Sequence, residues 1–187
     1  MKFEETFNKE RIKEWQQNYI NVNALKEKTN RHHLVESQNL SEEINEFDNI
    51  LKNELDKVSD FYNKNVKEII DDIELLNNES DSSINFRDVS EKCDKLRQFV
   101  LLNIIAVIKI VKRRNKRTPS IMDTGKELQN LDFYKCTQLK FAFRELKSIS
   151  DNVKLNYADK LMQNMTTITS FRSLAAIREN CNFEDYN

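Results

Sequence analysis

The sequence is poor in the residues that make turns, with one glycine and one proline among 187 residues. Because β-hairpins and βα units need such residues where the chain reverses, this scarcity argues against a sheet-rich fold. About a third of the residues are charged, and apolar side chains recur every three or four positions over long stretches. That spacing is typical of amphipathic helices. We therefore expect an all-α protein.

Signals for a membrane, a disulfide framework or a metal are also lacking. No segment reaches about 18 uninterrupted apolar residues, and the opening MKFEETF has no apolar core of a signal peptide. The cysteines are odd in number, widely spaced and without a CxxC pair, so we interpret them as reduced thiols: Cys93, Cys136 and Cys181. His32 and His33 are adjacent, point in different directions and have no partners downstream. We expect a cytoplasmic or cytosol-facing chain with no metal, no cofactor and no membrane span.

An enzyme is not predicted. The chain has no Gly-rich phosphate loop, no nucleophile motif and no metal-ligand spacing. A run of acidic residues at Asp71, Asp72 and Glu74 is interpreted as a solvated helix face rather than a metal site. The net charge of −1 gives the whole molecule no strong attraction to nucleic acid or anionic membranes. Any binding of anions must therefore come from a local basic patch.

The chain is long enough for one domain with a sizeable core. We expect a single helical domain over residues 1–178 and a frayed polar tail over 179–187. Two short helices, roughly 3–17 and 22–30, should form an N-terminal hairpin, with Asn21 as N-cap of the second. A long core helix of about 30 residues follows from Ser41, and the polar stretch NNESDSS connects it to the next helix.

The second long helix should begin near Asn85 or Asp88 and stop before Thr118 and Pro119, because proline disfavours helix at the residue before it. Its stretch from Phe99 to Val111 is apolar nearly all round, so it should lie at the centre of the bundle. Residues 120–129 should form a loop or a short helix, and residues 131–150 and 153–178 one or two further helices.

The end of this central helix reads KIVKRRNKR over residues 109–117 and holds six of the thirty basic residues. At 3.6 residues per turn, four of them share a sector of roughly 100°: Lys109, Lys112, Arg113 and Lys116. Arg114 and Arg117 fall off the centre of that face. Such a stripe either faces an anionic ligand or is a solvated surface that binds nothing.

Three segments resemble the SPX domain family, the cytosolic helical module of eukaryotic phosphate-homeostasis proteins. The opening MKF, EW at 14–15 and YINVNALK at 19–26 are similar to the family's N-terminal hairpin. FDNILKNELDKVSDFY at 47–62 is similar to the start of its first long helix. FVLLNIIAVIKIVKRRNKRT at 99–118 resembles the FVxLNxxAxxKIxKKxDK segment of its second. The three occur in the family's order and cover nearly the first 120 residues.

The resemblance implies an N-terminal hairpin packed on two long core helices, followed by shorter C-terminal helices. It also implies a sensor that binds inositol polyphosphates, above all inositol pyrophosphates. By motif, Lys2, Lys26 and Lys109 would line the phosphate pocket, and Lys112, Arg113 and Lys116 would form the adjacent basic surface. A ligand with clustered phosphates needs several cations from separate elements, because each exposed ion pair alone is weak.

The sequence departs from the family pattern at three places. Val22 replaces a tyrosine that would donate a hydroxyl to phosphate, and valine has no donor. Glu4 replaces the glycine near Lys2 and can repel an anion. Asn115 replaces an acidic residue, while Arg113 replaces a lysine and can still bind phosphate. We therefore expect a retained but altered site.

Two alternatives stay open. The basic end can instead belong to a helical module that binds a protein partner or nucleic acid and no inositol phosphate, although no aromatic residue interrupts the run, as RNA binding would favour. The patch can also be vestigial, with the domain only packing against a neighbouring one. The chain is either complete or the regulatory part of a larger enzyme or transporter.

Overall fold

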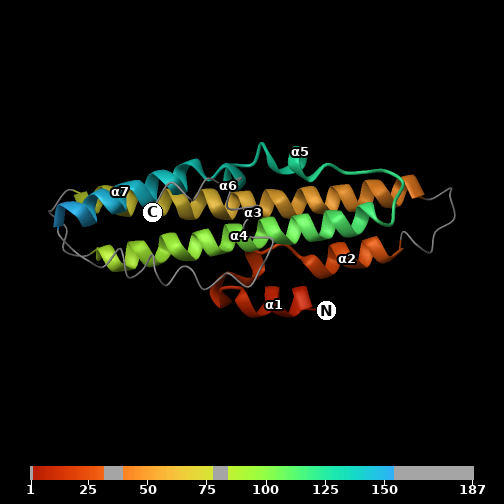
Figure 1. Cartoon of the computed structure of the whole chain (residues 1–187), viewed down its shortest axis with the longest axis horizontal. Coiled ribbons are helices and arrows are strands. Elements are labelled where there is room, and N and C mark those ends of the chain that lie inside the picture. The colour runs from red at the N-terminus through yellow and green to blue at the C-terminus, as the bar shows by residue number, and fades with distance from the viewer. Residues whose placement is uncertain (1, 32–39, 78–83, 154–187) are drawn as a thin grey trace.

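The computed structural model describes residues 2–31, 40–77 and 84–153, and all secondary structure in these ranges is helical. Figure 1 shows the arrangement. The elements are α1 (Lys2–Glu10), the 3-10 helix η1 (Lys13–Asn18), α2 (Val22–Arg31), α3 (Leu40–Asn77), α4 (Phe86–Asn115), α5 (Thr124–Leu128), α6 (Asp132–Lys135) and α7 (Thr137–Val153). The prediction of an all-α fold with a small N-terminal hairpin on two long helices is confirmed. None of the described helices combines the length and apolarity needed to cross a bilayer.

The two long helices α3 and α4 run antiparallel along the length of the molecule (Figure 1). Helix α7 packs against both of them near one end, and α2 packs against both toward the other end. Helix α1 contacts α4 and runs in the opposite direction to α2 (Figure 1). The hairpin of α1 and α2 is thereby placed beside the C-terminal half of α4, which carries the basic run.

Helix α4 is the centre of the bundle, as its apolar stretch predicts. Every residue from Phe99 to Val107 is buried, and α4 contacts α1, α2, α3, α5, α6 and α7. The one polar residue in that stretch, Asn103, is fully buried, and both the oxygen and the nitrogen of its side-chain amide form hydrogen bonds. Its Oδ1 accepts from the Ile20 backbone N–H at 2.9 Å, and its Nδ2 donates to the Phe99 carbonyl at 2.8 Å. This side chain fastens the entry of α2 to the central helix.

The first arm of the hairpin differs from the single helix expected over residues 3–17. Helix α1 ends at Glu10, Ile12 is extended with φ −65° and ψ 122°, and η1 follows. The Ile12 amide donates to the Tyr19 hydroxyl oxygen at 3.2 Å instead of to a helical carbonyl. The break also lets Trp15 pack against Phe61 and Phe99, at ring separations of 5.1 and 5.9 Å. Tertiary packing of aromatic rings therefore overrides the local helical pattern.

Other boundaries agree with the local signals. Asn21 caps α2 by accepting from the Ala24 N–H at 3.1 Å, and Asn85 caps α4 by accepting from the Arg87 N–H at 3.0 Å. Helix α3 is longer than expected, and residues 131–150 divide into α6 and α7 at Cys136. That residue has a left-handed φ of 54° and ends α6.

Several predictions fall on residues outside the described ranges. They concern His32 and His33, the connection within 78–83, Cys181, a helix over 153–178, the end of the domain at 178 and the tail 179–187. Cys93 and Cys136 are both buried free thiols, in agreement with the prediction of reduced cysteines. Burial raises the pKa of the Cys93 thiol well above its ordinary value.

Candidate functional site

Helix α2 and the residues leading into it run parallel to α4 in a fixed register. The Ile20 N–H donates to Asn103 at 2.9 Å, and Arg113 Nη2 donates to Asn30 Oδ1 at 2.9 Å; both pairs are 83 residues apart in sequence. Parallel helices with the same rise per residue keep such an offset along their length. By this offset Lys26 of α2 lies near the level of Lys109 of α4. The two predicted site residues thus come from adjacent helices at similar heights.

Lys26 is already engaged by an acidic residue of α1. Its Nζ lies 2.7 Å from Glu4 Oε1 and donates to Glu4 Oε2 at 2.8 Å. The two side chains are 24% and 23% exposed, so the pair is partly shielded from water. Lys2 is the first residue of α1, two positions before Glu4, and its side chain lies outside the described part of the structure. Glu4, which differs from the family pattern, therefore pairs with Lys26.

Three lysines of the basic run point into solvent: Lys109, Lys112 and Lys116. Within residues 2–31, 40–77 and 84–153, none of them forms a hydrogen bond or an ion pair. The positive charges of Lys112 and Lys116 are also favoured by the partial negative charge at the C-terminus of α4. The three lysines form the part of the predicted stripe that is free to meet a ligand, and we call them the α4 lysines.

Arg113, the fourth residue of the stripe, is directed toward the end of α2. It is half-buried and donates to Asn30 Oδ1. Arg117 donates to the same Asn30 oxygen and, at 3.3 Å, to the Thr29 carbonyl. Asn30 therefore joins two arginines one turn apart, and both cations lie at the C-terminal end of α2, where the helix dipole favours them. These two arginines hold α2 against α4.

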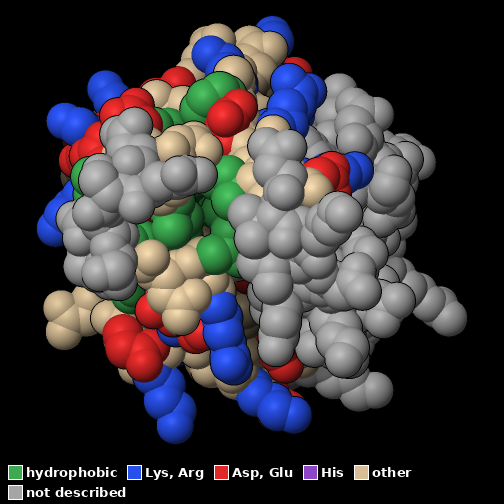
Figure 2. Space-filling view, turned by 90° about the vertical axis from the view of Figure 1, so that its left-hand side faces the viewer, with side chains coloured by type: hydrophobic (Ala, Val, Ile, Leu, Met, Phe, Trp, Pro, Cys, Tyr) green, Lys and Arg blue, Asp and Glu red, His purple; other side chains and the backbone are tan. Residues whose placement is uncertain are grey.

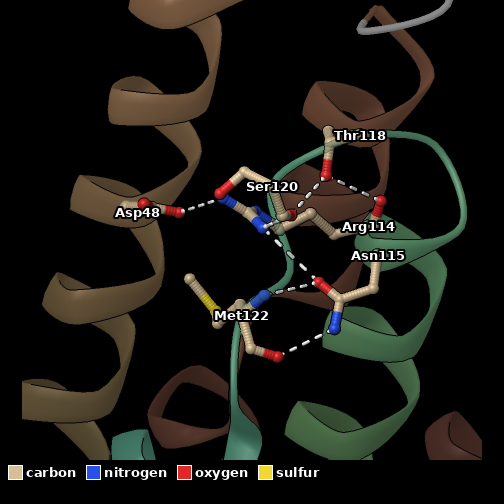
Figure 3. A network of polar contacts seen from close by, with 6 residues as sticks. All are labelled: Asp48, Arg114, Asn115, Thr118, Ser120 and Met122. Atoms are coloured by element: carbon tan, nitrogen blue, oxygen red, sulfur yellow. Dashed lines mark hydrogen bonds and ion pairs between the residues drawn. The ribbon is translucent and has the colours of Figure 1, made fainter.

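Arg114 is buried and has a structural role that we did not predict (Figure 3). It is 1% exposed, its Nη2 lies 3.2 Å from Asp48 Oδ1 on α3, and its Nη1 donates to the Ser120 carbonyl at 2.9 Å. Its guanidinium also lies 5.4 Å from the centre of the Phe47 ring. A signal was present in the sequence, since position 114 continues the series 100, 103, 107 and 111 that steps along the buried face.

Next to Arg114, Asn115 fixes the segment that leaves α4. Its Oδ1 accepts from the Met122 N–H at 3.0 Å, and its Nδ2 donates to the Met122 carbonyl at 2.8 Å (Figure 3). The Asn115 side-chain amide thus pairs with both backbone groups of Met122, as a neighbouring strand would. The departure at Asn115 therefore serves the connection to α5 and does not face the α4 lysines.

A polar cleft of about 230 Å³ lies on the side of the hairpin where α1, η1 and the start of α2 meet. Its lining includes Glu4 and Arg11 from α1 and the bend after it, Val22 from α2, and Lys57 from α3. Amide side chains supply most of the remaining wall, namely Asn8, Gln16, Gln17, Asn21 and Asn23. Val22 is 7% exposed and stands one turn before Lys26. Glu4 therefore belongs both to this cleft and to the ion pair with Lys26.

The opposite end of the bundle has a different charge pattern. Figure 2 views the molecule from the end where α7 finishes and α4 begins, and basic and acidic side chains alternate there around an apolar centre. Ion pairs join such charges near the start of α4, including Lys92 with Asp72 at 2.5 Å and Lys95 with Glu91 at 2.8 Å. The α4 lysines, which have no partner among the described residues, are found toward the other end of the bundle. Among the described residues, no group of three or more His, Cys, Asp or Glu side chains is placed to hold a metal ion.

No protein-family model matches the sequence, and no curated protein does. The structure is similar to a solved structure of the SPX domain of Chaetomium thermophilum glycerophosphodiester phosphodiesterase 1 in complex with inositol hexakisphosphate. The TM-score is 0.66 at 20% sequence identity, and the match covers 80% of this chain and 97% of that chain. The resemblance found in the sequence is confirmed at the level of the fold. The chain has the all-helical fold of an SPX domain.

Proposed function

We propose that the chain is a sensor domain for inositol polyphosphates, including inositol pyrophosphates, in phosphate homeostasis. The observation that carries this proposal is the similar level of Lys26 and Lys109, next to two further lysines of α4 that have no partner in the described part of the chain. The solved SPX domain with the same fold holds inositol hexakisphosphate, which supports the choice of ligand. The domain acts by binding, alone or as the regulatory part of a larger cytosol-facing enzyme or transporter.

The proposed site uses cations from separate helices. In this proposal Lys2, Lys26 and Lys109 hold the phosphates, and Lys112, Arg113 and Lys116 form the adjacent basic surface along α4. A single exposed ion pair contributes only about 0.2–1 kcal/mol. A ligand that presents several phosphates to several of these cations at once adds such contributions without a further loss of translational freedom. Clustered phosphates therefore match this arrangement better than one isolated phosphate.

Calorimetric titration of the whole chain with inositol hexakisphosphate and a pyrophosphate form, at low salt, tests the proposal. Lys109→Met, Lys112→Met and Lys116→Met should each cost about 1–2 kcal/mol of binding free energy, or roughly five- to thirtyfold in Kd. Lys64→Met is the matched control, because Lys64 is an exposed lysine on α3 and loses the same charge elsewhere. Absence of heat with the unsubstituted chain, or an equal loss in the control, contradicts the proposal.

The exposure of the α4 lysines also fits the alternative of an acidic protein partner or RNA. Such a partner would bind in the presence of saturating inositol hexakisphosphate, and its affinity would fall with salt according to the number of ion contacts. Competition by inositol hexakisphosphate at equal salt favours the sensor. Binding that is indifferent to inositol phosphates favours the interaction module.

A further inference from the structure

The carboxylate of Glu4 forms an ion pair with Lys26, the cation of α2 that a phosphate would bind in the proposed site. Both of its oxygens lie within 2.8 Å of Lys26 Nζ, so the carboxylate neutralises the charge of that ammonium and faces two of its three N–H donors. About three quarters of each side chain is buried, which weakens screening by water and salt. A ligand that reaches Lys26 must therefore replace Glu4 there.

We propose that Glu4 is an internal competitor for Lys26 and that it sets the ligand concentration at which the domain responds. This inference rests on the proposed function. The α4 lysines accept a phosphate without breaking any contact among the described residues, whereas Lys26 contributes only after Glu4 has left. Binding is then an exchange, in which the ammonium trades a carboxylate for a phosphate. The affinity is lowered by the free energy of the pair that is lost.

The structure also offers a place for the displaced carboxylate. Glu4 lines the polar cleft of about 230 Å³, whose wall includes the cationic side chains of Arg11 and Lys57. Positions 4, 8 and 11 follow one face of α1 and the bend after it, so a Glu4 side chain that turns away from Lys26 faces toward Arg11, whose guanidinium lies 5.4 Å from the centre of the Phe7 ring. Lys57 already pairs with Glu54 at 2.6 Å, which leaves Arg11 as the main attraction. The competitor is therefore reversible rather than a permanent block.

The repulsion between Glu4 and the ligand adds to the exchange. A carboxylate left near Lys26 interacts unfavourably with every phosphate bound at the level of Lys109. Replacement of Glu4 by glutamine removes both effects while it keeps the shape of the side chain. We expect Glu4→Gln to bind inositol hexakisphosphate about three- to tenfold more tightly.

The test compares four versions of the whole chain by calorimetry: unsubstituted, Glu4→Gln, Lys26→Met and the double variant. Glu5→Gln is the matched control, since it removes the same charge from the next residue of α1, which is exposed. That control should change Kd by less than about twofold. In the Lys26→Met background the gain from Glu4→Gln should shrink, because only the repulsion remains to be relieved.

A second measurement needs no ligand. Acylation of lysine amines followed by mass spectrometry reports how available each Nζ is, and Glu4→Gln should raise the labelling rate of Lys26 while leaving that of Lys64 unchanged. Saturating inositol hexakisphosphate should protect Lys26 in both versions. Thermal melts followed by circular dichroism serve as the control that each variant is folded.

The outcomes separate the two proposals. Tight binding by the unsubstituted chain with no gain in Glu4→Gln, or with the same gain in Glu5→Gln, overturns the competitor and leaves the sensor in place. Binding by Glu4→Gln alone supports Glu4 as a competitor for Lys26, but it overturns the sensor function of the unsubstituted chain. Absence of binding in every version overturns both. An unchanged labelling rate of Lys26 in Glu4→Gln also overturns the competitor.

Discussion

Arg114 and Asp48 form an ion pair in which the arginine is much more buried than the aspartate. Substitution of the one residue should therefore change the stability of the protein by a different amount than substitution of the other. The Arg114 side chain is 1% exposed, whereas that of Asp48 is 41% exposed. An arginine cannot shed its proton in a protein. Asp48→Asn therefore leaves a buried cation without its counter-charge, whereas Arg114→Met removes the buried charge and leaves a carboxylate that water can solvate. We expect Asp48→Asn to be the more destabilising change.

The contacts of Arg114 set the magnitudes. Loss of one partner of a buried pair costs about 3–5 kcal/mol. Here the cost is lower, because Asp48 is partly screened by water and Arg114 keeps the Ser120 carbonyl and the Phe47 ring. We expect about 1–2 kcal/mol for Asp48→Asn. Arg114→Met should cost about 0–1 kcal/mol, since methionine refills much of the space and the Ser120 carbonyl still accepts from the Thr118 hydroxyl at 3.0 Å.

Urea unfolding of the whole chain, analysed by linear extrapolation, measures both changes in the free energy of unfolding. Asp56→Asn is the control, because Asp56 is an exposed residue of the same helix, and it should stay within about 0.5 kcal/mol of the unsubstituted chain. If Arg114→Met destabilises the protein more than Asp48→Asn does, the reasoning from buried charge is wrong and packing of the arginine stem dominates.

Three further predictions concern a pKa, the site and the core. Burial raises the pKa of Asp94 from 3.8 to about 6 against the opposing effect of Arg97. The native state therefore binds this proton more tightly than the unfolded chain does, and the free energy of unfolding falls as the pH rises from 3.8 to about 6. Asp94→Asn removes this loss and should raise the free energy of unfolding at pH 7 by about 1–3 kcal/mol, measured by urea unfolding. Val22→Tyr should tighten inositol hexakisphosphate binding about two- to tenfold by calorimetry, because residue 22 stands one turn before Lys26 on α2 and a tyrosine hydroxyl can donate to a phosphate bound there. Asn103→Leu should cost about 2–3 kcal/mol and speed exchange of the Ile20 amide, which loses its acceptor.

Each of these predictions has an outcome that contradicts it. An Asp94→Asn variant whose stability falls over the same pH range as that of the unsubstituted chain places the titrating group elsewhere. Unchanged affinity in Val22→Tyr means that the proposed pocket does not reach residue 22. A stable Asn103→Leu variant with an unchanged Ile20 amide shows that another acceptor or water replaces the side chain.

The features that sequence predicted well depend on contacts between near neighbours. Asn21 and Asn85 cap their helices through amides two or three residues away, so the local pattern contains both donor and acceptor. The central position of α4 follows from apolar residues on all its faces. The SPX fold was indicated by three motifs in order, and the solved domain confirms it although the identity is only 20%.

The features that sequence did not reveal depend on contacts between distant residues. The break at Ile12 exists because the Tyr19 hydroxyl and the rings of Phe61 and Phe99 lie nearby in space. The pairing of Glu4 with Lys26 joins residues 22 positions apart across the hairpin. A sequence shows that Glu4 is acidic and near Lys2, but only the register of α1 against α2 selects which lysine it meets.

The six cations of the basic run 109–117 point in different directions around α4 and form three groups with different surroundings. Arg114 points inward to Asp48, Arg113 and Arg117 turn to Asn30, and the α4 lysines remain in solvent. Among the described residues, only this last group can bind an anion without giving up a contact, so three of the six cations of the run are available there. Counting basic residues therefore overstates the charge offered to a ligand by about twofold, and the arginines instead use their charge to hold α2 and α3 against α4. Because those contacts fix the level of Lys26 relative to Lys109, the structural arginines position the site even though they do not form its centre.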